Sequence, residues 1–147
     1  MIVWRRFLIW LAALFAMMPS MHAQQAHETV FERSNGQQTA TYAEGIAWWQ
    51  NLAKAYDAVR IRTAGMTDSG YPLHVVSITV DKPDAIATDK TVVLINNGIH
   101  AGEPDGIEAS MMLMRNLLQS EEGRQMLQAV EIHVIPFYSI GGVLNRN

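Results

Sequence analysis

Hydrophobic residues recur along the chain with two different periods, and the change from one period to the other outlines the secondary structure. Over residues 41–57, apolar positions three and four apart predict an amphipathic helix, and Thr41 with Glu44 forms a capping-box pattern at its start. Residues 58–65 and 71–80 are both rich in β-branched side chains, and a Met-Thr-Asp-Ser-Gly connection separates them. This arrangement predicts an antiparallel hairpin.

The second half of the chain predicts a strand, two helices and a further strand. Residues 91–95 form a continuous apolar run, which is typical of a strand covered on both faces. Residues 105–118 carry apolar side chains at helical spacing, and Ser120 followed by two glutamates predicts the start of a shorter helix. The strand-like segment 130–137 completes a β-α-β unit. Such a unit implies an α/β fold, with a parallel pair of strands and helices on the sheet faces.

The N-terminal residues follow another pattern and are set apart from the fold. Arg5 and Arg6 precede an apolar run over residues 7–18, and a short spacer ends at Ala23. This order is typical of a secretory signal peptide, and the apolar run is shorter than the roughly 20 residues that span a bilayer. We therefore expect removal of residues 1–23 on export to the periplasm or the outside, leaving no stable membrane span. An uncleaved membrane anchor is the alternative.

Composition adds three restrictions. With 147 residues, 49% of them hydrophobic and 17% charged, the chain is long and apolar enough for one packed domain. A formal net charge of -3 leaves no basic stripe for a phosphate backbone, which argues against nucleic acid as a partner. The chain has no cysteine, so an exported domain must be stabilised by its core rather than by disulfides, and thiolate metal ligands are excluded.

The candidate chemistry lies in the connection between the strand 91–95 and the following helix, where His100 and Glu103 are three residues apart. Gly102 permits an unusual backbone angle and Pro104 suits the first turn of a helix, so both side chains should project from the carboxyl end of a parallel strand. An imidazole nitrogen and a carboxylate oxygen at this spacing can converge on one zinc ion. The alternative is an ordinary loop histidine beside an acid favoured by the helix dipole.

The segment NNGIHAGEPDGIEASMMLMRNLL, with the strand VEIHVIPF after it, resembles the N-terminal part of a zinc carboxypeptidase domain of the M14 peptidase family. The resemblance runs from about Tyr42 to the end of the chain. It implies a mixed β-sheet flanked by helices, of the phosphorylase/hydrolase-like type. In that family the histidine and glutamate of the motif bind zinc, which implies that His100 and Glu103 are ligands of Zn²⁺. The implied substrate is a peptide or protein C-terminus.

The resemblance also identifies what the chain does not supply. The family's third zinc ligand, a histidine, and its general-base glutamate lie downstream of the matching region, so no residue is assigned to catalysis. We expect a signal peptide over 1–23, a loosely ordered polar lead-in over 24–40, and the N-terminal part of the domain over 41–147. We also expect no closing helix over 141–147. Such a fragment should be inactive by itself.

The other candidate residues are interpreted as structural. His133 alternates with apolar residues on a strand, His74 lies in the hairpin, and His27 lies in the lead-in. Asn145 and Arg146 superficially fit the Asn-Arg pair with which family members hold the terminal carboxylate of a substrate. They follow the strand too soon, so neither is assigned to substrate binding.

The sequence therefore predicts an exported zinc metallocarboxypeptidase, a peptide hydrolase in which zinc activates water for attack on the scissile carbonyl. Two alternatives share the same ligand frame or fold. One is a zinc amidase or deacylase acting on a small N-acyl substrate, and the other is a non-catalytic binding domain. A histidine, a glutamate and an arginine clamp in the downstream sequence would favour the peptidase. The histidine and glutamate without the clamp would favour a deacylase. The absence of all three would favour a binding domain.

Overall fold

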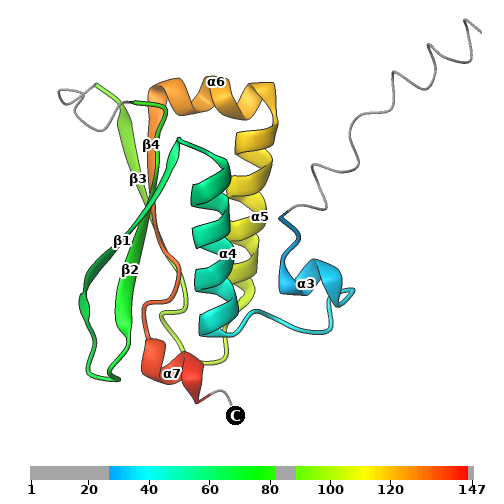
Figure 1. The fold of residues 1–147 in the computed structure, drawn as a ribbon, viewed down its shortest axis with the longest axis vertical. Coiled ribbons are helices and arrows are strands. Elements are labelled where there is room, and N and C mark those ends of the chain that lie inside the picture. The colour runs from blue at the N-terminus through cyan, green and yellow to red at the C-terminus, as the bar shows by residue number, and fades with distance from the viewer. Residues whose placement is uncertain (1–26, 82–88, 146–147) are drawn as a thin grey trace, which may run out of the picture.

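Four strands form one mixed β-sheet in the computed structural model, which describes residues 27–81 and 89–145. Helices α4 and α5 lie beside each other on one side of the sheet, and α7 lies at one end of it (Figure 1). The predicted α/β class with a mixed sheet is therefore confirmed. The elements are α3 (Val30–Arg33), α4 (Tyr42–Ala55), β1 (Val59–Met66), β2 (Pro72–Ile78), β3 (Thr91–Asn96), α5 (Asp105–Gln119), α6 (Glu121–Ala129), β4 (Val130–Ile135) and α7 (Ile140–Leu144).

The strands follow the order β1-β2-β4-β3 across the sheet. β1 and β2 form the predicted antiparallel hairpin, and β3 and β4 form the predicted parallel pair of a β-α-β unit. The two units are joined by antiparallel pairing of β2 with β4, in which Ser77 lies opposite His133. The last of the four strands in the sequence is thus an inner strand of the sheet.

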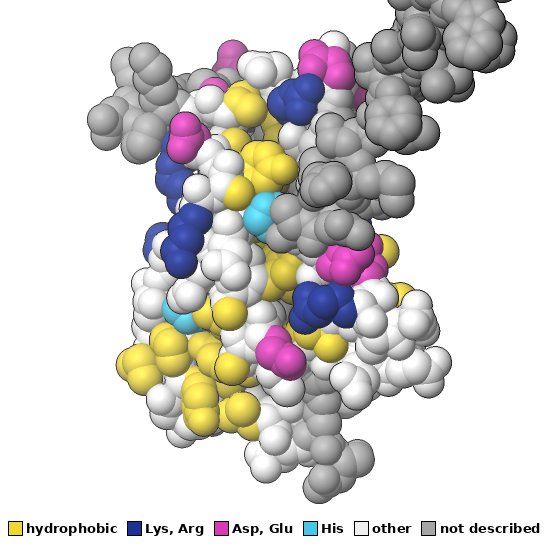
Figure 2. All heavy atoms as spheres, turned by 45° about the vertical axis from the view of Figure 1, so that its right-hand side comes forward, with side chains coloured by type: hydrophobic (Ala, Val, Ile, Leu, Met, Phe, Trp, Pro, Cys, Tyr) yellow, Lys and Arg dark blue, Asp and Glu magenta, His cyan; other side chains and the backbone are white. Residues whose placement is uncertain are grey.

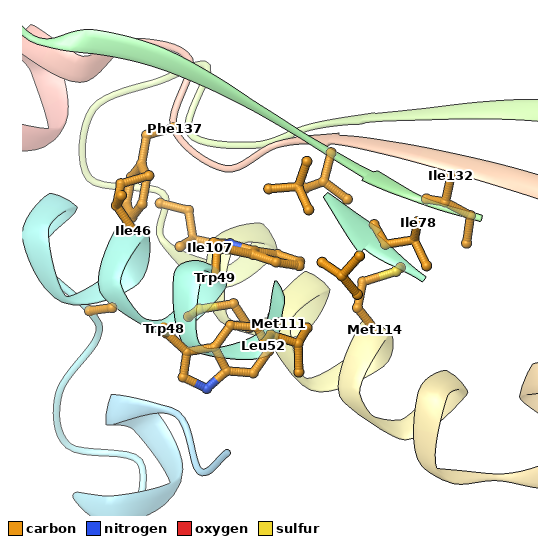
Figure 3. Close-up of a cluster of buried hydrophobic side chains, with 14 of the residues drawn as sticks. Ile46, Trp48, Trp49, Leu52, Ile78, Ile107, Met111, Met114, Ile132 and Phe137 are labelled. Carbon is orange, nitrogen blue, oxygen red and sulfur yellow. The ribbon is translucent and has the colours of Figure 1, made fainter. Parts of the chain in front are cut away.

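Helix α4 begins with the predicted capping box. The Thr41 side chain accepts a hydrogen bond from Glu44 N at 3.3 Å, and Glu44 Oε2 accepts one from Thr41 N at 2.9 Å. The apolar side of α4 packs against α5 and the sheet, with Trp49 and Leu52 fully buried (Figure 3). Met111 on α5 closes the same core, and each side chain of this size contributes about 1.5–3 kcal/mol on full burial.

Strand β3 is present as predicted, but its expected coverage on both faces is wrong for the described residues. It hydrogen-bonds to β4 alone and forms the edge of the sheet. The side chains of Val92 and Leu94 are 63% and 62% exposed, because no described element covers that face. A continuous apolar run indicates a strand suited to burial, whereas the element that buries it is not encoded in the run itself.

The segment 27–40 is not the loosely ordered lead-in expected from its composition. It contains α3, which is capped by Thr29 and Glu32, and the Thr29 side chain is fully buried. Arg115 on α5 holds the segment by donating to both carboxylate oxygens of Glu32 at 2.6 and 2.8 Å. The Thr-x-x-Glu pattern was a capping signal that the polar composition obscured. Residues 1–26, which include the predicted signal peptide, lie outside the described residues.

The expectation of no helix near the chain end is also wrong, because residues Ile140–Leu144 form α7. Two of its five residues are glycines, so its local propensity is low and packing must stabilise it. Ile140 and Val143 are buried in the main core. Asn145 closes the helix by donating its side-chain N–H to Gly141 O at 2.8 Å. Within the described ranges, no helix is long and apolar enough to cross a membrane.

Candidate metal site

The connection between β3 and α5 lies at the carboxyl end of β3, at the same end of the molecule as α7 (Figure 1). Its first residues continue the pairing of β3 with the chain that follows β4. Asn97 N donates to Ile135 O at 3.0 Å, and Tyr138 N donates to Asn97 O at 2.9 Å. Ser139 N then donates to Gly98 O at 2.9 Å. The backbone entering the candidate site is therefore fixed to the sheet.

Two glycines turn the connection. Gly98 has φ +61° and Gly102 has φ +82°, in the left-handed region where other residues are strained. A β-carbon at Gly98 would also lie 3.4 Å from Ile107 Cδ1 and 3.5 Å from Val143 Cγ2. The predicted special backbone at Gly102 is present, and Gly98 adds a second constraint that packs the connection against α5 and α7.

The structure brings His100 and Glu103 together. Nδ1 of His100 lies 3.0 Å from Oε2 of Glu103, and the two side chains are 74% and 69% exposed. An exposed pair of this kind contributes only about 0–1 kcal/mol to stability. Two donors bound to one tetrahedral zinc ion at about 2.1 Å lie about 3.4 Å apart, close to the observed separation. Nδ1 and Oε2 are hydrogen-bonded to each other here, and holding one zinc ion would replace that bond and separate the two atoms by about 0.4 Å.

A third protein ligand is not supplied by the part of the chain that the structure describes. Within residues 27–81 and 89–145, no three or more His, Cys, Asp or Glu side chains come together in a group that could hold a metal ion. Catalytic zinc sites usually have three protein ligands and a bound water. His100 and Glu103 could supply two of these four positions at most.

The other histidines that the structure describes, His27, His74 and His133, lie on structural elements outside the His100 loop. His133 lies on β4, where Nδ1 is 2.9 Å from Ser77 Oγ and Nε2 is 2.9 Å from Glu131 Oε1. Burial lowers the pKa of His74, which stacks against Tyr42. Burial, and secondarily the charge of Arg115, lowers the pKa of His27.

One residue next to the site was not indicated by the sequence patterns. The side chain of Asn97 is buried beneath the start of α5, where Nδ2 donates to Ser110 Oγ at 2.7 Å. Two asparagines, Asn96 and Asn97, after an apolar run resemble an ordinary strand end. The partner of Asn97 is 13 residues away, so no local spacing rule relates the two.

Solved structures of carboxypeptidases share this fold. A structure of thrombin activatable fibrinolysis inhibitor has a TM-score of 0.62 and 19% identity, over 72% of this chain and 27% of that one. Carboxypeptidase A from Helicoverpa armigera has a TM-score of 0.62 and 20% identity, over 71% of this chain and 25% of that one. A metallo-carboxypeptidase from Burkholderia cenocepacia has a TM-score of 0.61 and 18% identity, over 74% and 29% respectively.

The fold is therefore that of the carboxypeptidase-like α/β domains. The sequence profile of the M14 peptidase family, described as zinc carboxypeptidase, matches residues 45–143. The chain belongs to this family, which confirms the resemblance. It spans only 25–29% of the length of the three solved structures. No curated protein matches the chain.

Proposed function

We propose that His100 and Glu103 are two zinc ligands of an exported metallocarboxypeptidase that releases C-terminal residues from peptides or proteins. The observation that carries this proposal is that Nδ1 of His100 and Oε2 of Glu103 lie 3.0 Å apart, on an exposed loop at the carboxyl end of β3. Open α/β sheets bind their ligands beyond the carboxyl ends of their strands. Family membership supplies the reaction class.

The chain's own residues would contribute binding and orientation. Nδ1 of His100 and Oε2 of Glu103 would hold the ion, and Gly98 and Gly102 would keep the loop in the conformation that presents both donors. When bound, zinc polarises the scissile carbonyl and lowers the pKa of its water. We propose that the third ligand and the general base come from polypeptide outside these 147 residues. The small share of the solved carboxypeptidases that the chain spans supports this interpretation.

Apolar surface near the loop is compatible with a peptide substrate. Figure 2 shows hydrophobic side chains gathered at the lower left of the view, and two exposed apolar residues lie at the loop itself. Ile99 in the loop and Tyr138 beside it are both about half exposed. Sites for organic ligands are commonly lined by apolar and aromatic side chains around a few polar groups.

Zinc titration of the 147-residue chain tests the ligand assignment. Zinc should shift the backbone amide resonances of Ala101 and Gly102, and the fitted Kd should rise about tenfold or more in His100→Ala and in Glu103→Gln, because each loses a coordination bond. His133→Ala is the control and should titrate as the wild type does. Equal zinc affinity in the wild type and His100→Ala would refute the assignment. The chain alone should release no residues from unblocked peptides, since two ligands leave no complete site.

Export is the second part of the proposal. The order of Arg5, Arg6, the apolar run and Ala23 supports cleavage that leaves Gln24 as the first residue. Intact-mass measurement of the protein recovered from the periplasm or medium should give a chain lacking residues 1–23. A recovered chain that still begins at Met1 would show that the segment is retained.

A further inference from the structure

The two candidate ligands are held by different elements of the fold. His100 follows the part of the loop that is hydrogen-bonded to the chain after β4. Glu103 immediately precedes Pro104, the N-cap of α5. The separation between the two donor atoms therefore depends on how the first turns of α5 sit on the end of β3. Any residue that joins these two elements at this point controls the geometry of the pair.

Asn97 joins them. Its backbone N–H donates to Ile135 O at the end of β4, and its backbone carbonyl accepts from Tyr138 N just after β4. Its side chain is turned the other way, and Nδ2 donates to Ser110 Oγ on α5 at 2.7 Å. Ser110 Oγ uses its own proton toward Ile107 O at 3.1 Å, so the donors and acceptors of this chain of hydrogen bonds are matched. Asn97 is only 5% exposed, so water does not compete for these bonds.

Shape reinforces the hydrogen bond. A β-carbon on Gly106, in the first turn of α5, would lie 2.9 Å from Asn97 Oδ1. Real β-carbons do not approach an atom that closely without displacing it. The absence of a side chain at Gly106 is thus what allows the Asn97 amide to lie against the helix. The amide is confined between Gly106 and Ser110 and can adopt few other orientations.

A leucine at position 97 would have a similar size and would avoid the cost of burying an amide. Its apolar contacts would lack the direction of a hydrogen bond, however, and would leave α5 freer to slide or rotate on β3. A metal site is sensitive to such shifts, since mutating groups that hydrogen-bond to the ligands and orient them typically changes metal affinity 10–100-fold.

We propose that Asn97 is a positioning residue for the metal site: by fixing the first turns of α5 to the end of β3, it sets the distance between His100 Nδ1 and Glu103 Oε2. This inference rests on the proposed function, because it requires that His100 and Glu103 be the ligands. Asn97 itself lies under the helix and acts only through the two elements that it joins.

The test is a zinc titration of the 147-residue chain, followed by the amide resonances of Ala101 and Gly102, together with thermal unfolding. Asn97→Leu should raise the zinc Kd about tenfold. Gly106→Ala should do the same by displacing the amide, although alanine favours the helix. The double variant Asn97→Leu/Ser110→Ala removes both polar partners, and so should restore stability without restoring zinc affinity. A purely structural role for Asn97 predicts that stability and zinc affinity recover together in this variant.

Gly65→Ala is the matched control, because a β-carbon there meets nothing within 4 Å. Wild-type zinc affinity in the folded double variant and in Gly106→Ala would overturn the positioning role while leaving the ligands in place. If Asn97→Leu does not fold, those two variants decide the question. If the wild type and His100→Ala bind zinc equally, the ligand assignment fails and the positioning role fails with it.

Discussion

Replacing Arg115 with methionine is expected to lower the free energy of unfolding by about 3 kcal/mol. Arg115 is 1% exposed and donates to the Glu32 carboxylate at 2.6 and 2.8 Å and to His27 O at 3.1 Å. Methionine keeps much of the apolar stem but removes every one of these donors, so Glu32 keeps its charge without its buried partner. Urea unfolding followed by tryptophan fluorescence measures the loss, because Trp48 Nε1 donates to the same His27 carbonyl.

Acid should weaken the same contact. Hydrogen bonding to Arg115 is the main cause that lowers the pKa of Glu32 in the folded protein below its ordinary value of 4.5. A carboxylate with a lowered folded pKa stabilises the protein fully above the unfolded pKa, and this contribution is lost as pH falls through the folded pKa. The wild type should therefore lose more stability between about pH 5 and pH 3 than Arg115→Met does.

The control for this prediction is Glu32→Leu/Arg115→Met, which removes both charges. Replacing both members of a buried ion pair by apolar residues is often neutral, so the double variant should be more stable than Arg115→Met alone. Equal stability of the wild type and Arg115→Met, at both pH values, would show that the pair does not hold the segment around α3 to the domain.

Gly123→Ala is also expected to lower the free energy of unfolding by about 3 kcal/mol, although helix propensity alone predicts that alanine would stabilise α6. Alanine is favoured over glycine by about 1 kcal/mol inside a helix. At Gly123, however, the new β-carbon would overlap the carbonyl oxygen of Leu117 and lie 2.5 Å from its Cα. These are backbone atoms of the last turns of α5, so the corner between α5 and α6 would have to open, and overpacking of this kind costs about 1–3 kcal/mol or more.

Gly65→Ala supplies the comparison, since it makes the same chemical change in a strand with open space around the site. It should leave the free energy of unfolding unchanged within about 0.5 kcal/mol. Calorimetry on both variants gives the measurement. If Gly123→Ala unfolded at the wild-type temperature, the prediction would be wrong, and α5 and α6 would be able to move apart at Gly123 without loss of stability.

The sequence predicted best those elements whose signals are local. The capping box at Thr41 and the helical spacing after it define α4, and the β-branched runs on either side of a tight connection define the hairpin. The local capping signal of Thr29 and Glu32 was missed within a polar segment, whereas two other errors have non-local causes. Helix α7 contains two glycines and is held by the burial of Ile140 and Val143. The exposure of β3 depends on which elements cover it, and its own residues do not determine that.

The residues of the candidate site likewise differ in whether local sequence signals predict them. His100 and Glu103 were predictable as a pair, because three-residue spacing in a tight loop brings their donor atoms together. Asn97 was not, because its proposed role depends on Ser110 and on the missing side chain at Gly106, which come against Asn97 only through the packing of α5 on β3. A sequence motif thus indicates which atoms can bind a metal, while the residues that orient them emerge from tertiary packing.

The inner position of β4 has a consequence for biosynthesis. Ser77 and His133 are paired across β2 and β4 although they are 56 residues apart, and β3 has no described partner except β4. A ribosome adds about 5–20 residues per second, so the hairpin emerges several seconds before the strand that connects it to β3. Until then the nascent chain holds one isolated hairpin and one unpaired strand. Assembly of these four strands therefore begins only after β4 has been synthesised, which leaves the hairpin and β3 accessible to chaperones during that interval.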